Sequence, residues 1–93
     1  MSHSSIMELE TIKTEVRNHI RDKYRVAADD PDFSDEVHLY DYGYIDSFGA
    51  VQLISFLESR FSVKFTDSDL AGVPLRTVQE FATFIARRQK GEA

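Results

Sequence analysis

Apolar residues recur at three- and four-residue steps along much of this chain, and this spacing predicts helices. The first stripe lies on a helix that runs to about Tyr24, and it has five members: Ile6, Leu9, Ile12, Val16 and Ile20. A second amphipathic run fills residues 47–61. A third follows Thr77, and its stripe consists of Val78, Phe81, Ala82 and Ile85. No segment alternates apolar and polar residues as a half-buried strand does, so we expect an all-α fold.

Turn and capping signals divide these helical runs. Residues 66–69 have the form of a helix start, which predicts a short helix ending near Gly72, and Pro74 then breaks the chain. Thr77 and Glu80 have the spacing of a capping box for a last helix that reaches about Arg88. The expected architecture is a four-helix bundle of three long helices and one short helix. We expect one domain over residues 6–88, with flexible tails at residues 1–5 and 89–93.

The composition limits the chemistry that the chain can perform. The 93 residues include no cysteine, so the protein has no disulfide, no thiolate metal site and no thiol nucleophile of its own. No run of about 18 apolar residues occurs, and residues 1–5 lack the apolar core of a signal peptide. We therefore expect a cytoplasmic protein without a membrane span.

The net charge of −5 is concentrated in one stretch. Between Arg25 and Arg60 the chain has no Lys or Arg but eight acidic residues: Asp29, Asp30, Asp32, Asp35, Glu36, Asp41, Asp46 and Glu58. Such a field repels nucleic acid and attracts basic protein surfaces, and most of it falls in a long loop over residues 28–44. An acidic loop that only aids solubility is the alternative. We expect Phe33, Val37 and Leu39 to pin this loop.

Asp46 and Ser47 stand where the loop gives way to the second long helix. A serine at such a place usually caps the helix, but Asp46 can supply the cap itself. The Ser47 hydroxyl would then lie on the rim, within reach of another macromolecule. Helical geometry places Ala50, Leu53, Ile54, Leu57 and Phe61 on the core side. The opposite side carries Phe48, Val51, Gln52 and Ser55.

Neither catalysis nor metal binding is predicted. The pattern Gly-x-Ser-x-Gly around a hydrolase nucleophile is only half present, because Ile45 stands where the first glycine belongs. His38 is the one histidine expected near Ser47, and a solvated loop residue is the simpler interpretation. A calcium loop over residues 30–41 lacks the glycine at its sixth position and the glutamate at its twelfth.

The stretch from about Leu39 to Leu70 resembles the acyl and peptidyl carrier proteins. Residues 43–48, GYIDSF, match the attachment motif of that family, in which Asp-Ser is followed by a large apolar residue. The resemblance covers about residues 6–88. It implies that Ser47 is esterified with the 4′-phosphopantetheine arm of coenzyme A by a separate, magnesium-dependent phosphopantetheinyl transferase, which docks at Asp46. It also implies a partner-recognition face made of Phe48, Val51, Gln52 and Ser55.

The sequence differs from the carriers of fatty-acid synthesis. Gly49 and Gln52 occupy positions that are typically acidic there, and Ser59 interrupts a Glu-Glu pair. The chain looks more similar to discrete D-alanyl and aminoacyl carriers and to carriers of polyketide and nonribosomal peptide pathways. We interpret it as a monomeric carrier and not an enzyme. It would hold a thioester-linked acyl or aminoacyl group, receive it from a loading ligase and deliver it to synthase enzymes. The alternatives are a non-carrier interaction module of the same fold and, third, a small serine hydrolase.

Overall fold

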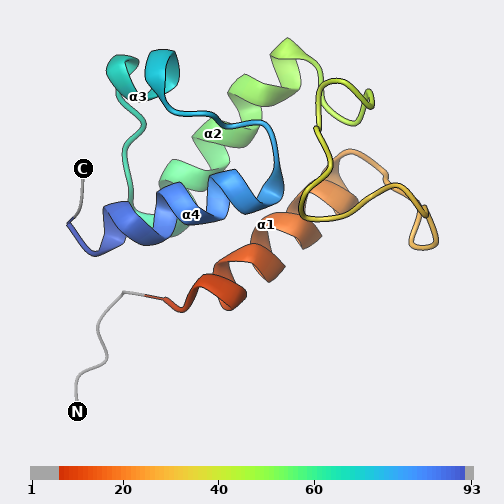
Figure 1. Ribbon diagram of the computed structural model, residues 1–93, viewed down its shortest axis with the longest axis horizontal. Helices are drawn as coiled ribbons and strands as arrows, with labels where there is room; N and C mark the ends of the chain where they lie inside the picture. Colours follow the sequence, from red (N-terminus) through yellow and green to blue (C-terminus); the bar gives the residue numbers. More distant parts are fainter. Residues whose placement is uncertain (1–6, 92–93) are drawn as a thin grey trace.

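The computed structural model describes residues 7–91 and contains four helices over this range (Figure 1). They are α1 (Leu9–Lys23), α2 (Ser47–Phe61), α3 (Asp67–Gly72) and α4 (Val78–Gln89). No strand occurs in this part of the chain. The predicted bundle of three long helices and one short helix is therefore confirmed. Ile6, residues 1–5 and residues 92–93 lie outside the described residues, and the proposed domain limits stay predictions.

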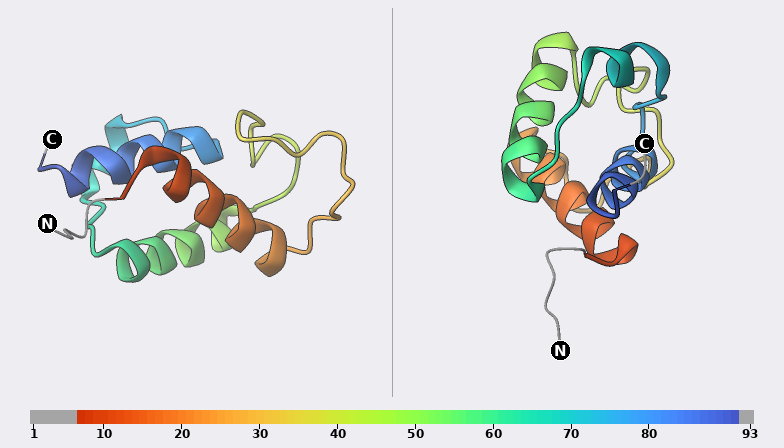
Figure 2. Two further views of the ribbon diagram at one scale, coloured as in Figure 1. Left: turned by 90° about the horizontal axis from the view of Figure 1, so that it is seen from below. Right: turned by 90° about the vertical axis from the view of Figure 1, so that its left-hand side faces the viewer.

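Long-range contacts fix the helix directions. α1 packs on α4, and the N–H of Met7 donates to Oε1 of Gln89 at 3.0 Å, which joins the start of one helix to the end of the other. α1 also runs antiparallel to α2, as three contacts in order along the two helices show. These contacts pair Glu15 with Arg60, His19 with Phe56, and Tyr24 with Gly49. Ser47 therefore lies at the end of the molecule where α1 finishes and from which the long loop projects (Figures 1 and 2).

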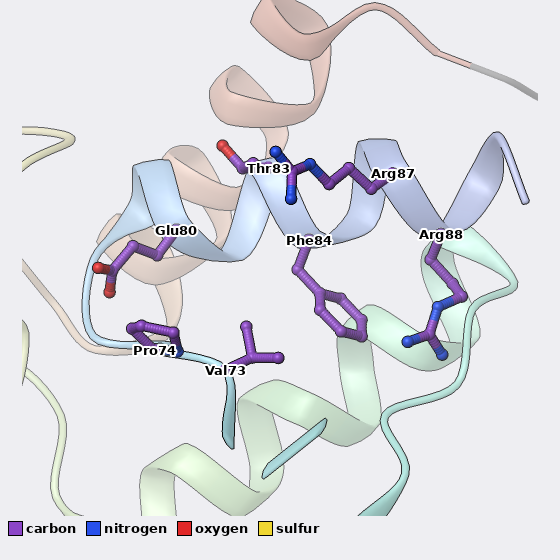
Figure 3. A pocket seen from close by; sticks show the side chains of 7 residues that line it. All are labelled: Val73, Pro74, Glu80, Thr83, Phe84, Arg87 and Arg88. Atoms are coloured by element: carbon purple, nitrogen blue, oxygen red, sulfur yellow. The ribbon is translucent and has the colours of Figure 1, made fainter. Parts of the chain in front are cut away.

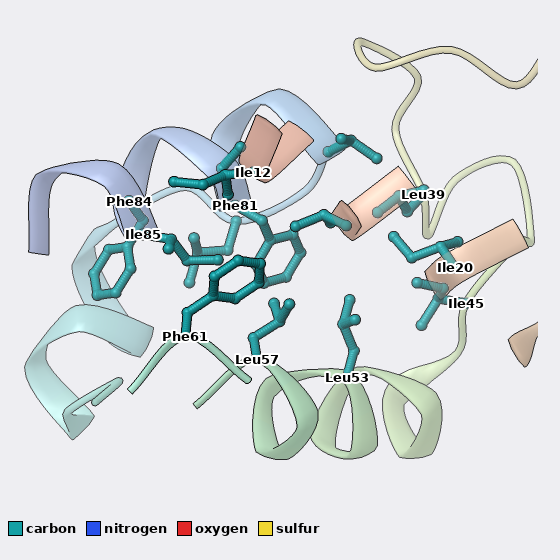
Figure 4. Packing of buried hydrophobic residues seen from close by; sticks show 14 of the residues in the cluster. Ile12, Ile20, Leu39, Ile45, Leu53, Leu57, Phe61, Phe81, Phe84 and Ile85 are labelled. Carbon is teal, nitrogen blue, oxygen red and sulfur yellow. The ribbon is translucent and has the colours of Figure 1, made fainter. Parts of the chain in front are cut away.

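The core is formed by one apolar stripe from each long helix (Figure 4). α1 contributes Ile12, Val16 and Ile20, α2 contributes Leu53, Leu57 and Phe61, and α4 contributes Val78, Phe81, Ala82 and Ile85. Ala50 and Ile54, also expected in the core, are half-buried at its edge. Each large side chain removed from water in this way stabilises the fold by about 1.5–3 kcal/mol. None of the helices among residues 7–91 has the length and apolar content needed to cross a membrane.

The helix ends agree with the sequence within a few residues, with one correction. α3 has the predicted capping box between Thr66 and Asp69. At α4, Oγ1 of Thr77 accepts the N–H of Glu80 at 3.0 Å, as expected. The Glu80 carboxylate, however, accepts the N–H of Arg76 at 2.8 Å and also pairs with the Arg76 guanidinium. The predicted second half of this capping box is therefore wrong, because the ion pair with Arg76 draws the carboxylate one residue further back.

The loop between α1 and α2 is held against the bundle by both side chains and backbone. Phe33, Val37 and Leu39 are buried, which confirms that they pin the loop. The N–H of Leu39 donates to the carbonyl of Arg76 at 2.8 Å, and its own carbonyl accepts from Tyr44 and Ile45. Hydrogen bonds of this kind place residue 45, and with it the start of α2, at a fixed point beside the α3–α4 connection.

Three tyrosines in the loop and before α2 have distinct roles in this packing. The hydroxyl of Tyr40 donates to the carbonyl of Leu75 at 3.1 Å, and that of Tyr44 donates to Oδ2 of Asp30 at 2.9 Å. Tyr42 stacks on Tyr44 and stays 60% exposed. Tyr40 therefore ties the loop to the rest of the bundle, whereas Tyr44 closes the loop upon itself.

Asp35 does not contribute to a free negative surface as the sequence suggested. Its carboxylate accepts two hydrogen bonds from the guanidinium of Arg17, at 2.8 and 2.9 Å, and lies 3.7 Å from the ammonium of Lys13. The hydrogen bond with Arg17 is the main cause that lowers the pKa of Asp35. The backbone carbonyl of Asp35 also accepts the N–H of Gln79, so this residue joins the loop to both α1 and α4.

Replacing Asp35 with Asn should therefore destabilise the fold by about 2 kcal/mol at neutral pH, the usual loss for a hydrogen-bonded charge. Because folding lowers the pKa of Asp35, its contribution is complete above the ordinary aspartate pKa of about 4 and disappears as pH falls through the lowered value. Urea unfolding at several pH values measures this difference. The control is Glu36→Gln, which removes a charge from the exposed neighbouring residue and should leave stability unchanged.

Candidate functional site

The first turn of α2 is capped by Asp46, as the sequence predicts. Asp46 has extended backbone angles, and its Oδ1 accepts the N–H of Gly49 at 2.8 Å. Ser47 is the first helical residue and is exposed. Its hydroxyl makes no hydrogen bond among residues 7–91. The cap and the serine are therefore separate, and the hydroxyl is available for chemistry without loss of the helix start.

The surroundings of Ser47 suit a phosphate group. The unpaired N–H groups of a helix start and the helix dipole favour an anion there, and α2 has no acidic residue within its first turn. Beside Ser47 lies an open hollow of about 570 Å³. It is lined by Tyr40, Gly43, Ile45, Asp46, Ser47 and Ala50. Gly43 adopts a φ of 77°, a left-handed conformation that glycine accepts without strain, and thereby turns the loop toward Asp46.

The face of α2 that points away from the core is apolar at its centre. Phe48 is 70% exposed and Val51 is 64% exposed, and Gln52 and Ser55 are exposed beside them. These four residues, here called the exposed face of α2, lie where the sequence placed them. An uncovered apolar pair of this kind is typical of a surface that a partner protein covers. Leu70 on α3 is 46% exposed, and sequence reasoning missed it because a short helix has no clear periodicity.

Gly49 occupies a position that is typically acidic in the carriers of fatty-acid synthesis, but here it is buried. A Cβ atom at Gly49 would lie 3.1 Å from Cγ2 of Ile45 and 3.1 Å from Cε1 of Tyr24. No acidic side chain fits there without displacing these groups. Of Gly49 and Gln52, only Gln52 changes the surface chemistry relative to the carriers of fatty-acid synthesis, because only Gln52 is exposed.

The residues considered for hydrolysis and for calcium binding make other contacts in the structure. Nδ1 of His38 accepts the N–H of Asp41 at 3.1 Å, and the ring of His19 stacks on Phe56. His3 lies outside the described residues. Asp30 accepts hydrogen bonds from the N–H of Asp32 and from Tyr44. Within residues 7–91 no three potential metal-binding side chains come together.

A second hollow, of about 230 Å³, opens between the α3–α4 connection and α4 (Figure 3). Val73, Pro74 and Phe84 give it apolar walls. Two of its charged residues are already paired, Glu80 with Arg76 and Arg88 with Asp69. None of the candidate residues on α2 lines it, so it is separate from the site at Ser47.

A family model described as the phosphopantetheine attachment site matches residues 14–85, a range that includes Asp46, Ser47 and the exposed face of α2. The chain belongs to this family. Its members bind 4′-phosphopantetheine covalently, which supports a phosphopantetheine carrier role and confirms the resemblance seen in the sequence. No curated protein sequence matches the chain.

The residues at the start of α2 fit that prosthetic group. The carrier needs a hydroxyl that is accessible and not used elsewhere, and Ser47 is exposed and separate from the helix cap. The helix start favours the negative charge of a phosphodiester. The adjoining hollow gives the region nearest to Ser47 a partly apolar wall, from Ile45 and Ala50.

Truncating a side chain on the two faces of α2 should change the free energy of unfolding by very different amounts. Leu57 is fully buried, so Leu57→Ala should lower the free energy of unfolding by about 2–5 kcal/mol. Phe48→Ala removes a side chain that is 70% exposed and should change it by no more than about 0.5 kcal/mol. Chemical unfolding of both variants measures the difference. Equal losses would mean that the two faces are assigned the wrong way round.

Proposed function

We propose that Ser47 is the attachment residue and that the protein carries an acyl or aminoacyl group as a thioester between partner enzymes. The observation that carries this proposal is the division of tasks at the start of α2. Asp46 caps the helix, with Oδ1 at 2.8 Å from the N–H of Gly49, and the exposed Ser47 hydroxyl is left without a structural task.

The proposed role depends on a few properties of the chain itself. When bound, the arm supplies the thiol that a cysteine-free chain lacks. Oγ of Ser47 is the atom that would be esterified, and the helix start would stabilise the phosphate charge next to it. No side chain among residues 7–91 forms a hydrogen bond with the Ser47 hydroxyl, so a separate transferase is proposed to supply the base and the magnesium. We therefore propose that the chain is a carrier, and that the chemistry of attachment belongs to the transferase.

The exposed face of α2 is proposed to receive the transferase, the loading ligase and the synthase enzymes in turn. Phe48 and Val51 offer apolar area, and Gln52 and Ser55 offer neutral hydrogen-bonding groups. Glu58 is the one acidic residue within α2, and its Oε2 accepts the N–H of Phe65 at 2.8 Å. A face without free carboxylates supports a discrete aminoacyl or natural-product carrier over a fatty-acid carrier.

The non-carrier interaction module is the second candidate function. The same exposed face of α2 would serve it, because an apolar surface of this kind binds a partner whether or not Ser47 is modified. Its distinguishing property is that binding needs no arm. Modification of Ser47 therefore separates the two proposals directly.

Ser47→Ala should abolish attachment of the arm and leave the fold intact. Incubation with coenzyme A and a phosphopantetheinyl transferase should add the mass of one arm to the wild type and none to the variant. Loss of a helix cap costs about 1 kcal/mol, but here the cap belongs to Asp46, so the melting temperature should not change. Ser59→Ala, which changes an exposed serine later in α2, is the matched control and should be modified fully. Continued labelling of Ser47→Ala would place the attachment site elsewhere.

The free acids of the loop should accelerate docking in a salt-dependent way. Asp35 is paired with Arg17, so the steering charges must be exposed ones such as Glu36 and Asp41. We expect Glu36→Gln/Asp41→Asn to slow modification at low salt and to flatten its salt dependence.

The matched control is Glu8→Gln/Glu10→Gln, which removes the same charge at the start of α1, at the far end of that helix from Ser47 (Figure 1). This control variant should show the same modification rates as the wild type from low to high salt. An unchanged salt slope in the loop variant would mean that docking is mainly apolar and that the loop acids serve solubility.

A further inference from the structure

Gly49 is held on both sides by side chains from outside its own helix. Its N–H donates to Oδ1 of Asp46 at 2.8 Å, and its carbonyl accepts the hydroxyl of Tyr24 at 2.8 Å. Tyr24 is the C-terminal cap residue of α1. Ser47 lies in the same first turn, two residues before Gly49. One side chain thus connects the end of α1 to the turn that presents the serine.

The space at Gly49 is what allows this contact. A Cβ atom there would lie 3.1 Å from the Tyr24 ring, 3.1 Å from Ile45 and 3.2 Å from Oδ1 of Asp46. Separations of this size are tighter than ordinary contacts, so the ring, the buried Ile45 or the capping carboxylate would have to move. Glycine is otherwise unfavourable within a helix, and Gly49 has no left-handed backbone angle that would require it. Close approach of Tyr24 and Asp46 is therefore the physical reason for glycine at this position.

The first turn of a helix is its least constrained part, because its N–H groups have no partners within the helix. Here the Asp46 carboxylate holds the N–H of Gly49, and the Tyr24 hydroxyl holds its carbonyl. Burial, with a smaller effect of the Asp46 carboxylate, raises the pKa of Tyr24, so its hydroxyl remains a donor. The exposed face of α2 is not involved, since Phe48 and Val51 are largely exposed.

We propose that Tyr24 is a positioning residue that holds the first turn of α2 so that the Ser47 hydroxyl is presented to the transferase in one orientation. The inference rests on the proposed role of Ser47. It predicts an effect on the rate of transfer and not on the binding of the transferase, because the residues proposed to bind it are untouched. Glycine is necessary at position 49 because a larger residue would crowd the phenol ring of Tyr24 and the capping carboxylate of Asp46.

The test is Tyr24→Phe, which keeps the ring and removes only the hydrogen bond. We expect kcat for arm transfer to Ser47 to fall by up to about fivefold, because the loss of one neutral hydrogen bond changes the ratio of the held to the released first turn by about that factor, with KM unchanged. Amide hydrogen exchange of Gly49 and Ala50 should become faster, because the N–H of Ala50 makes the first bond of α2, to Asp46 at 2.8 Å. Tyr44→Phe is the matched control. It removes a similar hydrogen bond, 2.9 Å to Asp30 within the loop, and should leave kcat, KM and exchange at wild-type values.

Gly49→Ala is the second variant, and it should also lower kcat. The higher helix propensity of alanine offsets part of the stability lost when the side chains around position 49 move, so a slower transfer with a melting temperature close to that of the wild type separates positioning from unfolding. Equal kcat and equal amide exchange in Tyr24→Phe and wild type would overturn the inference, as would a change confined to KM. A wild-type protein that gains no arm is a different result and would contradict the proposed function of Ser47 itself.

Discussion

The structure depends on the burial of one apolar stripe from each of α1, α2 and α4 against the other two. Helices of 15, 15 and 12 residues are marginal in water by themselves, so none of them would persist without the shared core. Leu57 and Phe81, both fully buried, lie near the centre of this arrangement. The rotation of α2 about its own axis follows from the same burial, because turning Leu53 and Leu57 inward turns Phe48 and Val51 outward.

Within that frame, the region around Ser47 assigns structural and chemical tasks to different residues. Asp46 closes the helix start, Tyr24 and Ile45 fill the space beneath it, and Leu39 anchors the incoming loop. Asp35 is sequestered by Arg17, which leaves the more exposed acids to face approaching proteins. Such a division makes it possible to change the chemistry at Ser47 without changing the fold that presents it.

Local patterns were sufficient to predict the four helices, the limits of α2 and the Asp46 cap, because each depends on residues within a few positions of one another. The exposure of Phe48 and Val51 followed from helical geometry in the same way. Contacts between distant residues could not be predicted. Arg17 neutralises Asp35 across 18 residues, and Tyr24 bonds Gly49 across 25, and neither pair has a spacing that marks it. The capping box at α4 failed for a related reason, since the pattern shows which carboxylate is present but not that Arg76 competes for it.

The packing of α1 on α4 has a consequence for how the protein folds as it is made. These helices are separated by the long loop, α2 and α3, so the contacts that close the core join residues far apart in the sequence. Closing so large a loop must precede the gain from burial, which slows folding compared with a bundle of sequential neighbours. During synthesis, α1 and α2 leave the ribosome before α4 and cannot complete a core on their own. Their apolar stripes therefore stay exposed to chaperones until α4 has emerged.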